Sequence, residues 1–203
     1  MIRLYDYELS GSCYKVRLLL GFLQVECQIV PVDFVNGEHK RPDFLTLNPF
    51  GEIPVLEDGA LRLRDAQAIL VYLASRYDEQ RVWYPDDAQA RGLIHQWLAV
   101  GGGELMSISA ARLTKSLRYQ LDLDRLHATA HRALGILDAH VATRTFLELD
   151  RPTIADLACF PYSALAHEAG IDVSPYPNLV AWTRRIRALP GFTSMPGVWP
   201  AHH

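Results

Sequence analysis

Hydrophobic and polar side chains change their spacing several times within residues 1–77. The stretch "IRLYDY" at residues 2–7 alternates apolar and polar positions, as a half-buried strand does. After "SGS", apolar side chains from Val16 to Leu23 recur at helical spacing, and "CQIVPVDF" (27–34) predicts a second short strand. Two apolar runs on either side of Asp58-Gly59 predict a β-hairpin, and an amphipathic helix is expected from Asp65 to Tyr77.

The order of these elements predicts the fold class. Residues 1–77 have the strand and helix order of an α/β thioredoxin-like domain, with "NGEHKRPDFLTLNPFGE" at most briefly helical. The polar segment 78–87, "DEQRVWYPDD", contains a proline and is interpreted as a linker. Residues 88–203 show helical spacing and predict an all-α domain, within which Thr153 and Asp156 have the spacing of a helix capping box.

Composition excludes several classes of function. The net charge of -3 is spread along the chain without a basic patch, so nucleic acid is not an expected partner. No apolar run approaches the roughly 20 residues of a membrane span, and Met1 is followed by no signal core, which favours a cytoplasmic protein without a membrane partner. The three widely spaced cysteines, Cys13, Cys27 and Cys159, match neither a disulfide framework nor a zinc site, so no metal is expected.

Several stretches together resemble the cytosolic glutathione S-transferase family. They extend from "LYDYELSGSCYKVRLLL" through "GEHKRPDFLTLNPFGEIPVL" and "DAQAILVYLA" to "QWL", "TIADLA" and "YPNLVAWTRRI". The run "NPFGEIPVL" is the most specific of them, and the order of all the pieces covers nearly the whole chain. The resemblance implies the glutathione transferase architecture, and a serine-type member of a theta-like, zeta-like or related bacterial class.

The resemblance also implies a reaction and its partners. Glutathione would be the co-substrate, and its thiolate would be activated for conjugation to a small hydrophobic electrophile, a detoxification reaction carried out by a homodimer. Three alternatives stay open. "SGSCYKVR" suggests a glutathione-dependent cis-trans isomerase, and Ala66 suggests a non-catalytic binding protein on the same fold. A disulfide reductase would use either Cys13 or two glutathiones bound together.

The stretch "SGSC" (10–13) contains the candidates for contact with the sulfur of glutathione. A free thiol has a pKa near ~8.5, so its thiolate needs stabilisation, which a helix N-terminus and a donating hydroxyl can supply. By resemblance Ser10 takes the position of the catalytic hydroxyl, and Ser12 is the alternative. Either serine can instead be the helix N-cap, a role expected more for Ser12 than for Ser10. Cys13 is expected to be a buried, unreactive thiol.

Other residues are expected to bind the remaining parts of the tripeptide. By resemblance the Ile53–Pro54 peptide bond is cis, and the Ile53 backbone pairs with the cysteinyl backbone of glutathione in the manner of an added strand. His39, with Lys40 as its neighbour, takes the position that faces the glycine carboxylate. These assignments make one side of the predicted first domain a peptide-binding surface.

The start of the helix at residue 65 departs from the family pattern. Members of the family usually have an acidic residue followed by serine there, and both hold the γ-glutamyl carboxylate. In this chain Asp65 is shorter than the usual residue and Ala66 has no hydroxyl, although its backbone N–H remains. The missing hydrogen bond is expected to cost about 1.5–3 kcal/mol of binding free energy unless Gln67 compensates. Asp65 can bind the ligand, cap the helix, or do both.

The pocket for the electrophile is expected between the loop 7–9, a helix of the second domain and the C-terminal tail. Arg112 on that helix can either face an acidic acceptor or form a surface ion pair. Trp97 and Trp182 are expected in the core. The other predicted lining residues are Met106, Ala110, Leu113, Phe192, Met195 and Trp199.

Overall fold

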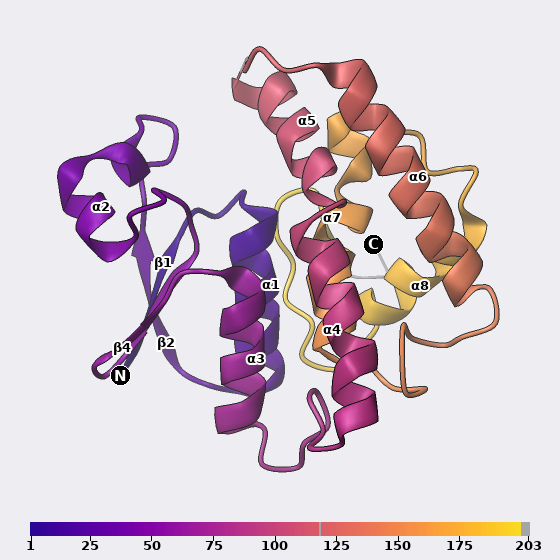
Figure 1. Cartoon of the computed structure of the whole chain (residues 1–203), viewed down its shortest axis with the longest axis horizontal. Helices are drawn as coiled ribbons and strands as arrows, with labels where there is room; N and C mark the ends of the chain where they lie inside the picture. Colours follow the sequence, from indigo (N-terminus) through magenta and orange to yellow (C-terminus); the bar gives the residue numbers. More distant parts are fainter. Residues whose placement is uncertain (118, 200–203) are drawn as a thin grey trace.

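A four-stranded mixed sheet forms the N-terminal part of the molecule in the computed structural model, which describes residues 1–117 and 119–199 (Figure 1). The strand order is β2-β1-β3-β4. β1 (Ile2–Asp6) is parallel to β2 (Cys27–Pro31) and antiparallel to β3 (Val55–Asp58), which turns back into β4 (Leu61–Leu63). β2 is therefore shorter than the predicted strand 27–34. The hairpin loop consists of Gly59, which has a φ of 60°, and Ala60.

Helices cover both faces of the sheet. α1 (Gly11–Phe22) and α3 (Ala66–Tyr77) pack on one face, and α2 (Pro42–Leu47) lies on the other, after the short 3-10 helix η1 (Glu38–Lys40). Successive side chains of β1 point to opposite faces of the sheet, as the alternation predicted for this strand requires. Leu4 belongs to the core beneath α1 and α3, whereas the Tyr5 ring meets Phe44 of α2 edge-on, with 6.3 Å between ring centroids.

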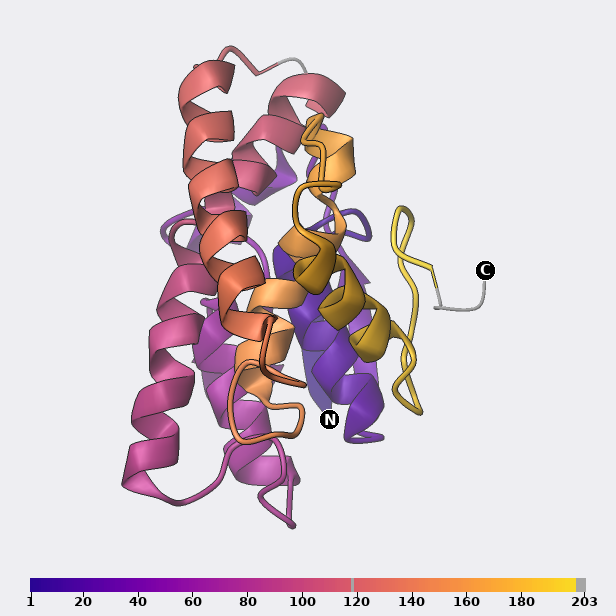
Figure 2. The same ribbon diagram turned by 90° about the vertical axis from the view of Figure 1, so that its right-hand side faces the viewer.

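The C-terminal part is helical, as predicted. It comprises α4 (Ala88–Gly102), α5 (Met106–Leu117), α6 (Leu123–Val141), α7 (Ile154–Ala164), the 3-10 helix η2 (Ala166–Ala169) and α8 (Pro177–Arg187). α7 lies at the centre of this bundle, between α1 of the first part and the surrounding helices (Figure 2). It is buried from Ile154 to Ser163, and Trp97 and Trp182 lie in the same core, as predicted.

The capping box predicted at the start of α7 is present. The Thr153 hydroxyl accepts a hydrogen bond from the Ala155 N–H, and the Asp156 carboxylate accepts one from the Thr153 N–H at 2.9 Å. The same carboxylate also accepts from the Leu147 N–H and the Trp182 indole, each at 2.9 Å. Burial raises the pKa of Asp156 to about 6 against the opposing effect of these donors. A single buried carboxylate thus joins α7, α8 and the loop before α7.

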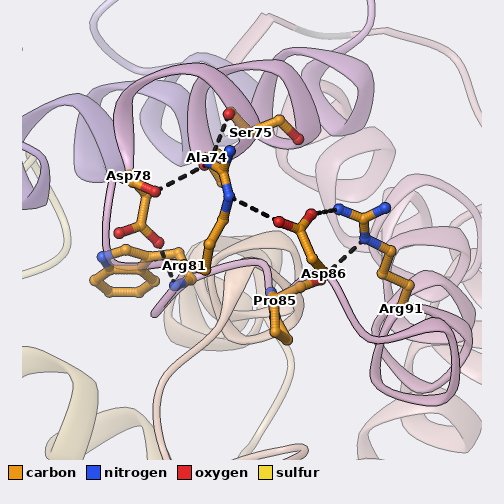
Figure 3. Close-up of polar contacts among 8 residues, drawn as sticks. Ala74, Ser75, Asp78, Arg81, Pro85, Asp86 and Arg91 are labelled. Carbon is orange, nitrogen blue, oxygen red and sulfur yellow. Dashed lines mark hydrogen bonds and ion pairs between the residues drawn. The ribbon is translucent and has the colours of Figure 1, made fainter.

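The predicted linker 78–87 has no helix or strand, but its side chains tie it to the helices on either side (Figure 3). The Arg81 guanidinium donates to the Ser75 carbonyl at 2.6 Å, near the C-terminal end of α3, and pairs with Asp86. Arg91 of α4 pairs with the same carboxylate and donates to the Pro85 carbonyl at 2.9 Å. Asp86 therefore bridges Arg81 of the segment and Arg91 of α4.

The sheet part and the helical part share one hydrophobic core. Buried residues of α1, α3, α4 and α7 form one cluster that crosses from one part to the other. α4 and α7 approach closely at Gly101, where an added Cβ would lie 2.6 Å from the Ala158 carbonyl oxygen. Lys15 of α1 is fully buried and donates to the Gly101 carbonyl at 2.7 Å. The division into domains 1–77 and 88–203 therefore stays a prediction.

Candidate functional site

A cavity of about 930 Å³ lies between the sheet part and the helical part. Its lining includes all eight residues that the sequence predicted for binding glutathione or its sulfur. They come from four separate segments of the first domain and meet on one side of the cavity. These residues are Ser10, Ser12, His39, Lys40, Ile53, Pro54, Asp65 and Ala66. The opposite wall is formed mainly by α5 and by Tyr162 of α7.

The N-terminus of α1 opens into this cavity, with Ser10 as its N-cap. The Ser10 backbone is extended, and its Oγ accepts a hydrogen bond from the Cys13 N–H at 3.2 Å. The expectation that Ser12 is the more probable cap is wrong, because Ser12 already lies inside the first helical turn. The Ser12 Oγ instead lies 2.8 Å from the phenol oxygen of Tyr162. Both serine hydroxyls therefore reach the cavity, in different surroundings.

The loop before α1 is held by an arginine from the same helix. Arg17 forms an ion pair with the buried Asp6 at the end of β1 and donates to the Glu8 carbonyl at 2.8 Å. The Ser10 N–H closes the turn by donating to the Tyr7 carbonyl at 2.9 Å. These contacts position the helix start relative to the sheet edge.

The thiol of Cys13 lies behind the helix start and does not reach solvent. Its side chain is fully buried, and burial, with the nearby Asp6 carboxylate, raises its pKa to about 12. At neutral pH the thiol is protonated and therefore a weak nucleophile. The predicted burial of Cys13 is confirmed.

Three stacked rings form the wall of the cavity near η1. The Phe34 ring stacks on Tyr7 at 5.4 Å and on His39 at 4.1 Å between centroids. The His39 Nδ1 atom is buried without a hydrogen-bond partner, and burial, with the Lys40 charge, lowers the pKa of this imidazole. Gly51 lies directly behind, with a φ of 58°, and an added Cβ there would lie 2.8 Å from the His39 carbonyl oxygen. The glycine of "NPFGE" is therefore required by close packing.

The Ile53–Pro54 segment and the start of α3 also line the cavity. The Ile53–Pro54 peptide bond is cis, as the resemblance implies. Asp65 is the N-cap of α3, and its carboxylate accepts from the Ala68 N–H at 2.9 Å. The neighbouring Gln67 has a buried Oε1 atom without a hydrogen-bond partner. Asp65, Ala66 and Gln67 all line the cavity, so the start of α3 with its backbone N–H groups borders it.

Arg112 of α5 lies on the opposite wall and forms an ion pair. Its guanidinium donates to the Glu168 carboxylate at 2.9 and 2.6 Å and to the Leu9 carbonyl at 3.3 Å. It thereby connects α5, η2 and the loop before α1 at the rim of the cavity. Of the two roles expected for Arg112, the ion pair is present, at a position that also faces the cavity.

The C-terminal tail, as far as the structure describes it up to residue 199, does not line this cavity, contrary to the prediction. Phe192 packs edge-on against Phe160 of α7, at 6.0 Å between centroids, and Met195 is buried in the shared core. Trp199 lines a separate cavity beside α8. The tail follows the side of the bundle where α8 and α1 lie, as Figure 2 shows. Its apolar residues are used for packing over α7 and α8.

Several residues of the cavity were not predicted from the sequence. Among them are Tyr162 and Ser109, which reach it from α7 and α5. Tyr162 lies in an unbroken run of buried residues, so its pattern indicates only core packing. No local signal identifies it as part of a site, because its neighbour Ser12 is 150 residues earlier in the chain.

Within residues 1–117 and 119–199 no helix is both long and apolar enough to cross a bilayer. The same ranges contain no cluster of three or more His, Cys, Asp or Glu side chains suited to a metal ion. Neither result defines the chemistry of the cavity.

Comparison with known proteins identifies the family. Models of the glutathione S-transferase N-terminal and C-terminal domains match residues 1–75 and 113–190. The chain is 32% identical to glutathione S-transferase 3 of Zea mays, over 94% of this chain and 91% of that protein. A crystal structure described as a possible glutathione S-transferase from Rhodopseudomonas palustris superposes with a TM-score of 0.87, at 32% identity over 96% of this chain and 97% of the other.

A further structure is similar, and it contains the tripeptide. This glutathione transferase homolog from Drosophila mojavensis, with bound glutathione, has a TM-score of 0.84 and 28% identity, over 93% of this chain and 88% of the other. The chain belongs to the glutathione S-transferase family. This membership confirms the fold class, the enzyme class and glutathione as co-substrate, all of which were predicted from the sequence.

Proposed function

We propose that the chain binds glutathione in the 930 Å³ cavity, stabilises its thiolate at the start of α1, and conjugates it to a small hydrophobic electrophile. The observation that carries this proposal is the open N-terminus of α1 in the cavity, flanked by the Ser10 and Ser12 hydroxyls. The first N–H groups of a helix have no carbonyl partner within it, and the positive end of the helix dipole favours an anion. A sulfur held there reacts as the thiolate.

Ser10 is the first candidate for the hydroxyl that donates to the sulfur, and Ser12 is the alternative. Ser10 Oγ already accepts from the Cys13 N–H, so its own proton is free to be donated. Capping and thiolate stabilisation are therefore compatible in this residue. The buried, protonated Cys13 argues against a disulfide reductase that uses this thiol.

The rest of glutathione is proposed to follow the cavity wall. The Ile53 backbone would pair with the cysteinyl unit, and the His39 imidazole and Lys40 ammonium would face the glycine carboxylate. The γ-glutamyl carboxylate would meet the Ala66 N–H and the Asp65 end of α3. These roles extend the sequence predictions to residues that line one cavity.

Gln67 is proposed to compensate in part for the missing hydroxyl at Ala66. Its unpaired, buried Oε1 can accept a hydrogen bond from the γ-glutamyl ammonium group. An unpaired buried acceptor costs free energy, which the bound ligand would recover. A non-catalytic binding protein, the alternative that Ala66 suggests, would bind glutathione without forming its thiolate.

The electrophile is proposed to enter beside α5. This side of the cavity has apolar and aromatic groups next to the Arg112–Glu168 pair, which suits a hydrophobic molecule with one polar substituent. The apolar and aromatic lining residues there are Tyr7, Leu9, Met106, Leu113, Leu117 and Tyr119. Conjugation of such electrophiles is the basis for the proposed role in detoxification.

We also propose a homodimer located in the cytoplasm. A second, largely apolar groove of about 780 Å³ lies between β4, α3 and α4, where a second copy could pack. All three cysteines, Cys13, Cys27 and Cys159, are free thiols, which suits a reducing compartment.

The test measures the pKa of bound glutathione by its ultraviolet thiolate absorbance, together with retention on immobilised glutathione. In the wild-type protein the bound thiol is expected to have a pKa below its free value of about 8.5. Ser10→Ala is expected to raise this pKa by about 1 and to lower kcat/KM about tenfold with a chromogenic aryl halide. Ser12→Ala, which removes the alternative donor at the second position of α1, is expected to have the smaller effect.

The outcomes separate the alternatives. An unchanged thiol pKa in Ser10→Ala, with a raised one in Ser12→Ala, would transfer the principal donor role to Ser12. Retention on glutathione without a thiolate signal would support the non-catalytic binding protein. If the wild type showed neither retention on immobilised glutathione nor thiolate absorbance, the proposed function would be refuted.

A further inference from the structure

A buried tyrosine of the helical part contacts the helix start where the sulfur is proposed to bind. Tyr162 of α7 is 1% exposed, lines the main cavity, and places its phenol oxygen 2.8 Å from Ser12 Oγ. Ser109 of α5 lines the same cavity. The hydroxyls of Ser12 on α1 and Tyr162 on α7 therefore meet at the cavity.

The surroundings hold the Tyr162 ring in one place. Gly11 makes room for it, since a Cβ at that position would lie 2.5 Å from Tyr162 Cε1. On another side the Lys15 ammonium lies 4.9 Å from the ring centroid and is itself fixed by the Gly101 carbonyl. A ring packed against a helix start and a buried cation has little freedom to turn its hydroxyl away.

The direction of the hydrogen bonds follows from acidity. A phenol is a stronger acid than an alkyl hydroxyl, and a cation over the ring makes it a better donor still. Tyr162 therefore donates to Ser12 Oγ. Ser12 then has its own proton left to donate, and consecutive bonds of this kind strengthen one another.

We propose that Tyr162 is a positioning residue that turns the Ser12 proton into the cavity, so that Ser12 is a second hydroxyl donor to the bound thiolate beside Ser10. No covalent bond forms or breaks, and each proton stays on its own oxygen. This inference rests on the proposed function, because it needs a thiolate at the start of α1.

The test substitutes Tyr162→Phe, which keeps the ring and removes only the oxygen. The bound-thiol pKa is expected to rise, and kcat/KM at a pH below that pKa is expected to fall about threefold to tenfold. The dissociation constant of glutathione measured with the thiol protonated should stay near the wild-type value. Ser12→Ala should reproduce the effect, and the double variant should be no worse than either single variant.

Tyr14→Phe is the matched control for loss of a buried hydroxyl. Tyr14 lies on α1 but donates to the Thr193 carbonyl at 2.6 Å, away from the cavity. The pKa of the thiol bound to Tyr14→Phe should therefore equal that of the wild type. A wild-type thiol pKa in Tyr162→Phe, while Ser10→Ala raises it, would overturn the inference and leave the proposed function standing. Additive effects of Tyr162→Phe and Ser12→Ala would also overturn it. Absence of thiolate in the wild type would refute the proposed function, and the role of Tyr162 with it.

Discussion

Among single residues, Lys15 is the most unusual, because a lysine side chain is rarely removed entirely from water. It is fully buried between α1 and α4, and its ammonium donates to the Gly101 carbonyl in the last turn of α4. The negative end of that helix dipole favours the cation. Burial nevertheless dominates and lowers the pKa of Lys15 to about 8. The neighbouring Cys159 and Asp65 oppose this shift.

This lowered pKa predicts a specific pH dependence of stability. Between the folded pKa of about 8 and the ordinary value of 10.5, the unfolded chain binds more protons at Lys15 than the native state. The contribution of Lys15 to the free energy of unfolding therefore rises with pH in this window, and its burial is most costly below pH 8. The free energy of unfolding of the wild type, relative to that of Lys15→Met, should therefore rise by on the order of 2 kcal/mol between pH 7 and pH 10, as measured by urea unfolding.

The control for this measurement is Lys115→Met at an exposed lysine of α5. Its difference from the wild type should be the same at both pH values. Parallel pH profiles of the wild type and Lys15→Met would show that the Lys15 proton is bound equally in both states, and would contradict the prediction.

At the scale of elements, the contact of α4 with α7 depends on a glycine. Gly101 allows the α4 backbone to approach Ala158, and a methyl group there would meet backbone atoms at 2.6 and 2.8 Å. Because backbone atoms cannot turn aside as a flexible side chain can, Gly101→Ala should lower the free energy of unfolding by about 1–3 kcal/mol or more. Denaturant unfolding followed by circular dichroism measures this.

The same helix contains the matched control. Gly92 has no atom within 4 Å of an added Cβ, so Gly92→Ala should leave stability unchanged or raise it, by up to about 1 kcal/mol, through helix propensity. If the two variants were equally stable, close packing at Gly101 would not determine how α4 and α7 cross.

At the scale of the whole molecule, the groove between β4, α3 and α4 predicts self-association. Apolar groups from both parts of the chain line it, among them Leu63, Val71 and Leu98. Monomeric proteins seldom expose large contiguous apolar surfaces. Sedimentation should show a dimer for the wild type and a monomer for Val71→Glu, because dimerisation would bury the new charge without a partner.

The control for that variant is Ile136→Glu on α6, at a side chain that is 51% exposed and far along the chain from the groove. It introduces the same charge and should remain dimeric. A monomeric wild type at micromolar concentration would contradict the proposed homodimer, whereas dimers of Val71→Glu would place the interface elsewhere.

The sequence by itself determined the order of elements and the capped start of α7, and it predicted eight residues that line the candidate site. Strand alternation, helical spacing and turn residues are short-range properties, so they predicted β1, the hairpin after Asp58 and the helices of the second part. The eight predicted site residues line one cavity because they belong to local motifs whose places in the fold are set by that element order. The predicted strand 27–34 is longer than β2. The pairing of β2 with β1 ends at Pro31, whereas the apolar run in the sequence continues beyond this residue.

Only the tertiary structure decided how these pieces meet. The capping role of Ser10 rather than Ser12 depends on where α1 begins against β1 and its loop, and no local period specifies that residue. The course of the tail depends on packing against α7 and α8, which removed Phe192 and Trp199 from the predicted pocket. The contact of Tyr162 with Ser12 joins residues 150 positions apart. Such contacts depend on the relative placement of whole helices, which a single segment of sequence does not encode.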